Sequence, residues 1–136
     1  MFNIYQEPAG IEGAIKRAGI GLINDMPVNS TIAVLNVASD DRTLTTFVVD
    51  ELEFQLFSAR SFTIVDRKTL DTIRTEQNFQ MSGDVSDSSA VSIGQMLGAN
   101  IVITGSITGT GALQRLSFKA LDVETAKIVT MVRETF

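Results

Sequence analysis

The stretch TIAVLNV, residues 31–37, restricts the possible folds of this chain more than any other feature of its sequence. It is apolar almost throughout, whereas a strand with one face in water alternates between apolar and polar residues. A continuously apolar strand is buried on both faces, so helices must cover both sides of the sheet that contains it. The sequence therefore predicts an α/β fold with residues 31–37 as a central strand.

Two amphipathic segments flank this strand and predict helices. Residues 10–26 carry an apolar stripe, and Pro27 ends that helix. Residues 39–59 begin with capping residues and continue as a second helix. The side chains that we expect to face the core are Ile11, Ala14, Ile15, Ala18 and Leu22 in the first helix, and Leu44, Phe47, Val48, Leu52 and Leu56 in the second.

A second strand and two further helices are expected in the middle of the chain. Residues 61–66 predict the strand, and its last residue, Asp66, is the expected N-cap of a helix over about residues 67–78. Residues 87–99 predict the next helix, which ends at Gly98 in the left-handed conformation. The core-facing residues are expected to be Leu70 and Ile73 in the first of these helices, and Ala90, Ile93, Met96 and Leu97 in the second.

The last part of the chain predicts a β-meander over residues 100–108, 112–123 and 128–136, with short turns between the strands. In the middle strand apolar and polar residues alternate, which predicts one buried and one exposed face. The apolar set is Leu116, Phe118 and Ala120, and the polar set is Arg115, Ser117 and Lys119. The whole order is α-β-α-β-α-α-β-β-β, a single α/β domain with a mixed sheet flanked by helices. Its expected extent is residues 1–136, with an N-terminal helix and linker over 1–30 and the core over 31–136.

Composition excludes several classes of function. The formal net charge of the 136 residues is −5, and the sequence lacks the clustered Lys and Arg of a nucleic-acid-binding surface. It contains no Cys and no His, which removes zinc fingers, thiol nucleophiles, His-dependent triads and nearly every transition-metal site. We therefore expect no metal and no organic cofactor, with an oxygen-ligand site for a hard cation as the alternative that stays open.

No apolar run approaches the roughly 20 residues of a membrane helix. The first residues, MFNIYQEPAG, show no signal-peptide pattern. From the residues alone we expect that the protein is cytosolic or that a leader has been removed from it.

Four segments resemble a known family in their order and spacing: IAVLNVASDD, FTIVDRKTLDTIRTEQ, IGQMLGANIVITGSITG and LSFKALDVETAKIV. Together they are similar to the CsgG-like family of curli assembly and transport proteins, over about residues 31–131. The resemblance implies an anticodon-binding-domain-like α/β fold, shared with the N-terminal domain of TolB. A related architecture occurs in the lipoprotein activator of a peptidoglycan synthase, and none of these proteins resembles an enzyme.

The resemblance also implies a location and a mode of action. We expect a bacterial lipoprotein-type domain that is periplasmic or associated with the outer membrane. Its membrane attachment would come only from a lipid outside this chain. It would contact a protein partner or itself, and we expect no nucleic acid and no small-molecule substrate.

The type member of the family is an oligomeric outer-membrane secretion channel, and this chain is short in the segments that build its pore. The turn GTG, residues 109–111, stands where the channel has a long hairpin, and ASDDRT, residues 38–43, stands where it has a long loop. We therefore predict a non-catalytic domain without a pore, with a subunit of a curli-like secretion channel as the alternative. An enzyme is a third hypothesis, and it requires a cleft that holds two acidic side chains with shifted pKa values.

The stretch from Asp66 to Gln77 concentrates acidic, basic and amide residues. Charge pairs at helical spacing, such as Arg67 with Asp71, are typical of a solvated helix with its cap. A contact with a partner or another subunit is the alternative. The family resemblance implies that Asp66 and Arg67 fix the strand-to-helix corner, while Glu76 and Gln77 lock the following loop.

The loop after this helix places Phe79 and Met81 among polar residues. Such side chains either cover the edge of the core or anchor a partner. We predict that Phe79 and Met81 contribute more to association than to folding, and that Glu76 and Gln77 complete the candidate partner-binding set.

Three polar or glycine-rich loops have structural explanations. GSITGTG, residues 105–111, is expected to be a hairpin turn, because no helix follows it to bind phosphate. SDD, residues 39–41, has too few oxygen ligands for a calcium loop and is expected to cap a helix. GDVSDSS, residues 83–89, is expected to be a loop followed by an N-cap rather than a cation site. The residues expected to have structural roles are Asp66, Arg67, Gly98 and Gly105.

Overall fold

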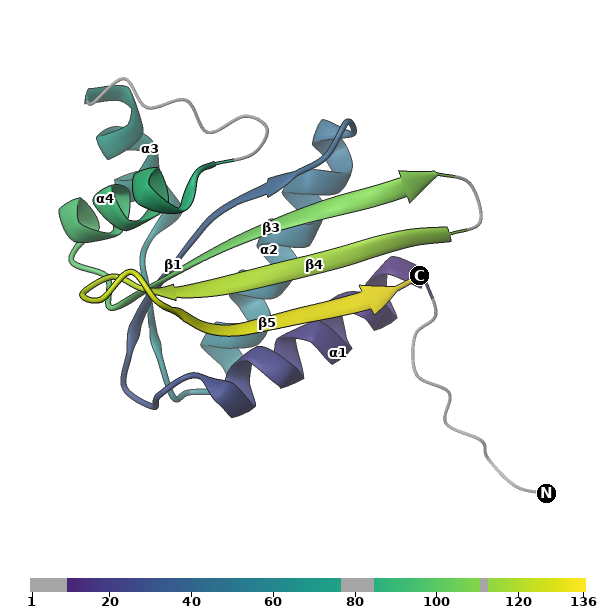
Figure 1. Ribbon diagram of the computed structural model, residues 1–136, viewed down its shortest axis with the longest axis horizontal. Helices are drawn as coiled ribbons and strands as arrows, with labels where there is room; N and C mark the ends of the chain where they lie inside the picture. Colours follow the sequence, from purple (N-terminus) through teal and green to yellow (C-terminus); the bar gives the residue numbers. More distant parts are fainter. Residues whose placement is uncertain (1–9, 77–84, 111–112) are drawn as a thin grey trace.

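The computed structural model describes residues 10–76, 85–110 and 113–136 of the chain (Figure 1). Helices and strands follow one another within these ranges in the order that the sequence predicts. The helices are α1 (Gly10–Asp25), α2 (Arg42–Ser58), α3 (Arg67–Glu76) and α4 (Asp87–Leu97), and the strands are β1 (Thr31–Ala38), β2 (Thr63–Ile64), β3 (Ile101–Thr110), β4 (Leu113–Asp122) and β5 (Ile128–Thr135). Within the described ranges, no helix combines the length and the apolar character that crossing a membrane requires.

The five strands form one mixed sheet in the order β2-β1-β3-β4-β5. β1 runs parallel to both of its neighbours, β2 and β3. The meander of β3, β4 and β5 is antiparallel. Within β1, Ile32 and Val34 belong to one hydrophobic core, while Ala33 and Leu35 belong to another. The predicted central strand with two buried faces and the predicted α/β class are therefore confirmed.

Helices α1 and α2 lie on one side of the sheet, which we call the covered face (Figure 1). The larger core lies on this side. It contains Leu22 of α1 and Leu52 of α2 together with Leu116 and Phe118 of β4, all of them buried. The apolar stripes of the first two helices thus contact the apolar half of the alternating strand, as their spacing predicts.

Helix α1 runs alongside β5 in the opposite direction, and polar contacts hold the two together. The Nε atom of Arg17 lies 2.6 Å from Oε1 of Glu134. At the last residue of α1, Thr130 Oγ1 of β5 donates a hydrogen bond to Asp25 Oδ2 at 2.7 Å. These contacts fix β5 to the helix beneath it.

Helices α3 and α4 pack against the other side of the sheet only at one end (Figure 1). The smaller core is located there and contains Leu70 of α3, Ile93 of α4, Val102 of β3 and Leu121 of β4. Further along β3, β4 and β5, this side carries polar residues that no described helix covers. The incomplete cover leaves part of the sheet exposed.

Gly105 of β3 lies opposite Phe118 of β4. A Cβ atom at Gly105 would lie 2.7 Å from Cδ1 of Phe118 and 2.8 Å from the carbonyl oxygen of Ser117, closer than side chains tolerate. Glycine therefore lets the Phe118 ring lie against β3 and fill the core, where Phe118 is 1% exposed. The role of Gly105 in this structure is one of packing.

Capping residues begin and end the helices near the predicted positions. Asp41 accepts a hydrogen bond from the backbone N–H of Leu44 at 3.1 Å at the start of α2. Ser86 accepts one from the N–H of Ser89 at 3.2 Å at the start of α4. Gly98 follows α4 with a φ of 71°, in the left-handed region that favours glycine.

Two predictions about these elements are wrong in detail. β2 spans Thr63–Ile64 instead of residues 61–66, because it is an edge strand that pairs only with β1. Met96 was expected in the core but is 45% exposed. The face of α4 that reaches the sheet contains Ala90, Ile93 and Gly94, and Met96 lies roughly 100° around the helix from the centre of that face.

Candidate functional site

The residues of β3, β4 and β5 that point away from α1 and α2 form a surface that we call the open sheet face. The strand register aligns them in three rows, Thr104–Lys119–Met131, Ser106–Ser117–Arg133 and Thr108–Arg115–Thr135. Side chains within a row are neighbours, because directly opposite residues of antiparallel strands have Cβ atoms about 4.5–5.5 Å apart. The open sheet face is therefore a compact grid of nine side chains.

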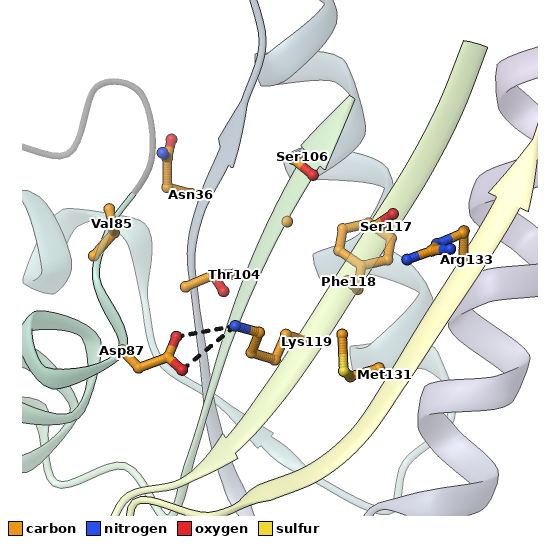
Figure 2. Close-up of a pocket in the computed structure, with 11 residues that line it drawn as sticks. Asn36, Val85, Asp87, Thr104, Ser106, Ser117, Phe118, Lys119, Met131 and Arg133 are labelled. Atoms are coloured by element: carbon orange, nitrogen blue, oxygen red, sulfur yellow. Dashed lines mark hydrogen bonds and ion pairs between the residues drawn. The ribbon is translucent and has the colours of Figure 1, made fainter. Parts of the chain in front are cut away.

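A hollow of about 400 Å³ lies on this face beside the N-terminal end of α4. Its lining residues include Thr104, Ser117 and Lys119 on the strands, with Asp87 on α4 (Figure 2). Met131 of β5 contributes an apolar side chain that is 57% exposed. The hollow thus combines hydroxyl groups, charged groups and one apolar side chain on a surface open to solvent.

The open sheet face is basic, although the chain as a whole has a formal net charge of −5. Its ionisable residues are Arg115, Lys119 and Arg133, all cations. Lys119 is partly neutralised, because its Nζ atom donates to Oδ1 of Asp87 at 3.1 Å (Figure 2). Among the residues that the structure describes, none forms an ion pair with Arg115 or Arg133. Two positive charges are therefore available to an acidic ligand.

The chemistry of this surface favours hydrogen bonds and ion pairs with a second molecule. A serine nucleophile requires a neighbouring base, and the acidic group that lines the hollow, Asp87, is paired with Lys119. No group of three or more Asp and Glu residues suited to a metal occurs in the described part of the chain. The open sheet face is accordingly our candidate functional site, as a binding surface.

Arg67, for which we predicted a structural role, joins three elements at the start of α3. Its Nη2 atom donates to the backbone oxygen of Val34 in β1 at 3.2 Å and lies 3.7 Å from Oε1 of Glu53 in α2. Asp66 contributes its backbone carbonyl to the first turn of α3. The ion pair expected with Asp71 is therefore replaced by the pair with Glu53, because the Arg67 side chain points toward β1 instead of along its own helix.

The Glu53 carboxyl group lies where several charges meet. Burial raises the pKa of Glu53 above its ordinary value of 4.5, while Arg67 lowers it. The carboxylates of Asp50, Asp66 and Asp71 raise this pKa further. Since the net shift is upward, ionised Glu53 is not fully compensated by Arg67.

A second hollow, of about 230 Å³, lies beside Arg67 and is also lined by Asp71 and Arg74. Asn36 lines both this hollow and the larger one on the open sheet face. The polar stretch that the sequence singled out and the open sheet face therefore share a border. A partner that covers the open sheet face can extend onto α3.

The candidate partner-binding residues of the sequence are mostly outside the described residues. Gln77, Phe79 and Met81 fall between residues 76 and 85, and Glu76 is the last residue of α3. Their role in binding stays a prediction.

Sequence reasoning did not assign a function to Met131 and Arg133 of β5. A signal was present, because residues alternate along IVTMVRET. Val132 and Glu134 contact the α1 side, which leaves Met131 and Arg133 for the opposite side. What the alternation could not indicate is that α4 stops short of this part of the sheet.

Comparison with known proteins gives one family match. The family described as curli production assembly/transport component CsgG matches residues 28–117 of the chain. A search of curated proteins finds no significant match to the sequence.

Solved structures with the same fold come from several bacteria. The LpoB C-terminal domain from Salmonella enterica matches with a TM-score of 0.79 and 17% identity, over 91% of this chain and 96% of that chain. The NMR structure of Escherichia coli LpoB gives 0.75 and 18%, over 99% of this chain and 80% of that one. Lipoprotein GNA1162 from Neisseria meningitidis gives 0.61 and 17%, with 79% of each chain covered. At these identities the matches establish a shared fold.

Proposed function

This chain belongs to the family of the curli production assembly/transport component CsgG, and we propose that it is a non-catalytic domain of the bacterial cell envelope that binds a partner protein. The proposed location is the periplasm, close to the outer membrane, with attachment through a lipid outside residues 1–136. The similar fold of a protein described as a lipoprotein, GNA1162, supports this location.

The observation that carries the proposal is the basic open sheet face on an acidic chain. Arg115 and Arg133 are exposed there, and neither has an ion-pair partner among the described residues. Complementary charge steers association and selects between partners. The proposed partner therefore presents an acidic surface to this face.

The first partner to test is a peptidoglycan synthase of the same bacterium. The choice rests on the fold shared with LpoB, the lipoprotein activator of such a synthase. In this proposal the domain regulates the synthase by contact and performs no chemistry itself.

The experiment measures binding of the purified domain to the purified synthase by calorimetry, together with the rate of glycan polymerisation. A variant with both Arg115→Glu and Arg133→Glu reverses two charges of the open sheet face. We expect it to bind at least about tenfold more weakly than the wild type, since reversed charges repel the acidic surface.

The matched control reverses two exposed cations outside this face and outside α3, Arg60→Glu and Lys127→Glu, and should bind within about twofold of the wild type. An equal loss of affinity in both variants would mean that binding depends on the net charge of the chain and not on the open sheet face. Failure of the wild type to bind any synthase of the bacterium would exclude this partner class.

The segment after α3, which contains Phe79 and Met81, is proposed as a second contact. The double variant Phe79→Ser and Met81→Ser should weaken binding of the same partner while leaving the thermal unfolding curve nearly unchanged. A loss of more than about 3 kcal/mol in the free energy of unfolding would instead mark both residues as part of the core.

A further inference from the structure

β5 forms one edge of the sheet and is long enough to pair with another strand. It spans eight residues, Ile128–Thr135, whereas the opposite edge strand, β2, spans two. An edge strand presents backbone N–H and C=O groups that have no neighbouring strand. Natural edges are often blunted by proline, and β5 contains none.

The register of β4 and β5 determines which backbone groups face outward. Gln114 and Phe136 exchange hydrogen bonds in both directions, at 3.3 and 2.9 Å. Opposite pairs in an antiparallel ladder alternate between bonded and non-bonded. The bonded pairs of β5 with β4 therefore continue at Glu134 and Val132. The N–H and C=O groups that point away from β4 are those of Met131, Arg133 and Thr135.

These three residues also carry the side chains that β5 contributes to the open sheet face. No hydrogen bond joins their outward backbone groups to another residue in the described ranges. The ties from Arg17 to Glu134 and from Asp25 to Thr130 hold the strand in place. An incoming strand would thus pair with an edge whose ordering is already complete, which lowers the entropic cost of binding.

The charge on the edge selects the occupant. Arg133 lies at the centre of the three outward residues, and Arg115 lies diagonally beside it on β4. Opposite charges on neighbouring strands attract, and like charges directly opposite each other repel. A second copy of β5, paired symmetrically about Arg133, would place two guanidinium groups against each other. An acidic residue opposite Arg133 instead lies beside this cation, and Arg115 lies one strand farther away on the same face.

We propose that β5 binds an extended acidic segment of a partner protein, which adds to the sheet as a sixth strand. The proposal rests on the proposed function, which it makes more specific. Backbone hydrogen bonds to Met131, Arg133 and Thr135 supply affinity, and acidic side chains on alternate positions of the segment contact the open sheet face. The occupant is recognised by its extended conformation and by acidic residues at every second position.

The probe is an acetylated heptapeptide that alternates threonine and glutamate, added to the full chain. NMR measures amide hydrogen exchange at each residue of β5. We expect the peptide to slow exchange at Met131, Arg133 and Thr135, while Val132 and Glu134 change little because their amides already bond to β4. The same peptide with lysine in place of glutamate should leave exchange unchanged.

A pair of variants isolates the backbone contribution. Met131→Pro removes an N–H that points away from β4, so the native ladder stays intact. Met131→Ala removes the same side chain and keeps the N–H. We expect the proline variant to bind the peptide about threefold to tenfold more weakly than the alanine variant, the effect of one backbone hydrogen bond.

Equal binding by the two variants, or binding without slower exchange on β5, would overturn strand addition and leave the contact through the open sheet face in place. Absence of binding at millimolar peptide would also overturn it. Concentration-dependent protection of the same three amides in the chain alone would identify a second copy as the occupant and contradict the acidic partner.

Discussion

The two faces of the sheet are made by the same strands, yet they differ in what covers them. On β4, the residues of the covered face are at most 1% exposed; they are Leu116, Phe118 and Ala120. The residues of the open sheet face are half-buried or exposed; they are Arg115, Ser117 and Lys119. The difference arises because α1 covers one side of β4 and β5 and α2 covers the same side of β1 and β2, whereas α3 and α4 cover only one end of the other side. The covered face therefore determines stability, and the open sheet face is free to determine binding.

The largest effect that tests this comparison comes from truncating a side chain of the covered face. Phe118→Ala removes a ring that is 1% exposed and leaves a cavity in the larger core. We expect the free energy of unfolding to fall by about 3–5 kcal/mol. Denaturant titration measures this change.

Ser117→Ala, at the next residue on the open sheet face, is the matched control. Its effect should stay within about 0.5 kcal/mol, as for other surface positions without special contacts. Comparable losses at Ser117 and Phe118 would mean that the two faces do not differ in their contribution to stability.

The second-largest effect is expected where Gly105 lies close to Phe118. Gly105→Ala places a methyl group within 2.7 Å of the Phe118 ring and 2.8 Å of a backbone oxygen, and the backbone atom cannot rotate away. We expect a loss of about 1–3 kcal/mol from overpacking. Thermal unfolding of Gly105→Ala and of Ser106→Ala, which adds nothing to the core, provides the comparison.

The sequence predicts the covered face well because that face follows local periodicity. The apolar stripes of α1 and α2 and the alternation around Phe118 each occur within one element, so pattern and element coincide. The prediction that Met96 is buried failed for a related reason. The side of α4 that meets the sheet is set by Gly94, which is small enough to approach Val102 of β3 and Val123, the residue after β4, closely. A stripe of large apolar residues does not reveal that side.

The open sheet face could be predicted only in part. The alternation of Arg115, Ser117 and Lys119 identifies an exposed face on β4, but the row-by-row alignment with Met131 and Arg133 depends on the register between strands. The gap in the helical cover depends on where α4 begins relative to β3. Both are long-range relations, which no local pattern contains.

Glu53 and Arg67 connect the helices of the two faces around the β2 edge, and the third test concerns their charges. Burial raises the pKa of Glu53 above 4.5, so the folded chain holds this proton more tightly than the unfolded chain does. The stability that this tighter proton binding contributes is fully present below pH 4.5 and is lost as the pH rises through the pKa of Glu53 in the folded state. Glu53→Gln should therefore raise the melting temperature at pH 7.

The advantage of Glu53→Gln should disappear when the pH falls below about 4.5, where Glu53 is protonated in both states. Glu51→Gln, an exposed position on the same helix, removes the same charge and serves as the control. A melting temperature that falls at pH 7 in Glu53→Gln would mean that the pair with Arg67 outweighs the burial of the carboxylate.

The smallest expected change in stability comes from the ion pair that partly neutralises the open sheet face. Asp87 and Lys119 are 3.1 Å apart, with side chains 50% and 31% exposed. An exposed pair of this kind contributes about 0–1 kcal/mol, and Asp87 also lies in the first turn of α4, where an acidic residue adds a similar amount. Asp87→Asn should therefore lower the free energy of unfolding by no more than about 1–2 kcal/mol.

The same change frees Lys119 and makes the open sheet face more basic. The threonine–glutamate peptide should therefore bind more tightly, and the gain in affinity should be larger at low ionic strength. Peptide titrations of the wild type and of Asp87→Asn at two salt concentrations measure this. Unchanged or weaker binding would place the peptide away from Lys119 and limit the recognition of acidic segments to Arg115 and Arg133.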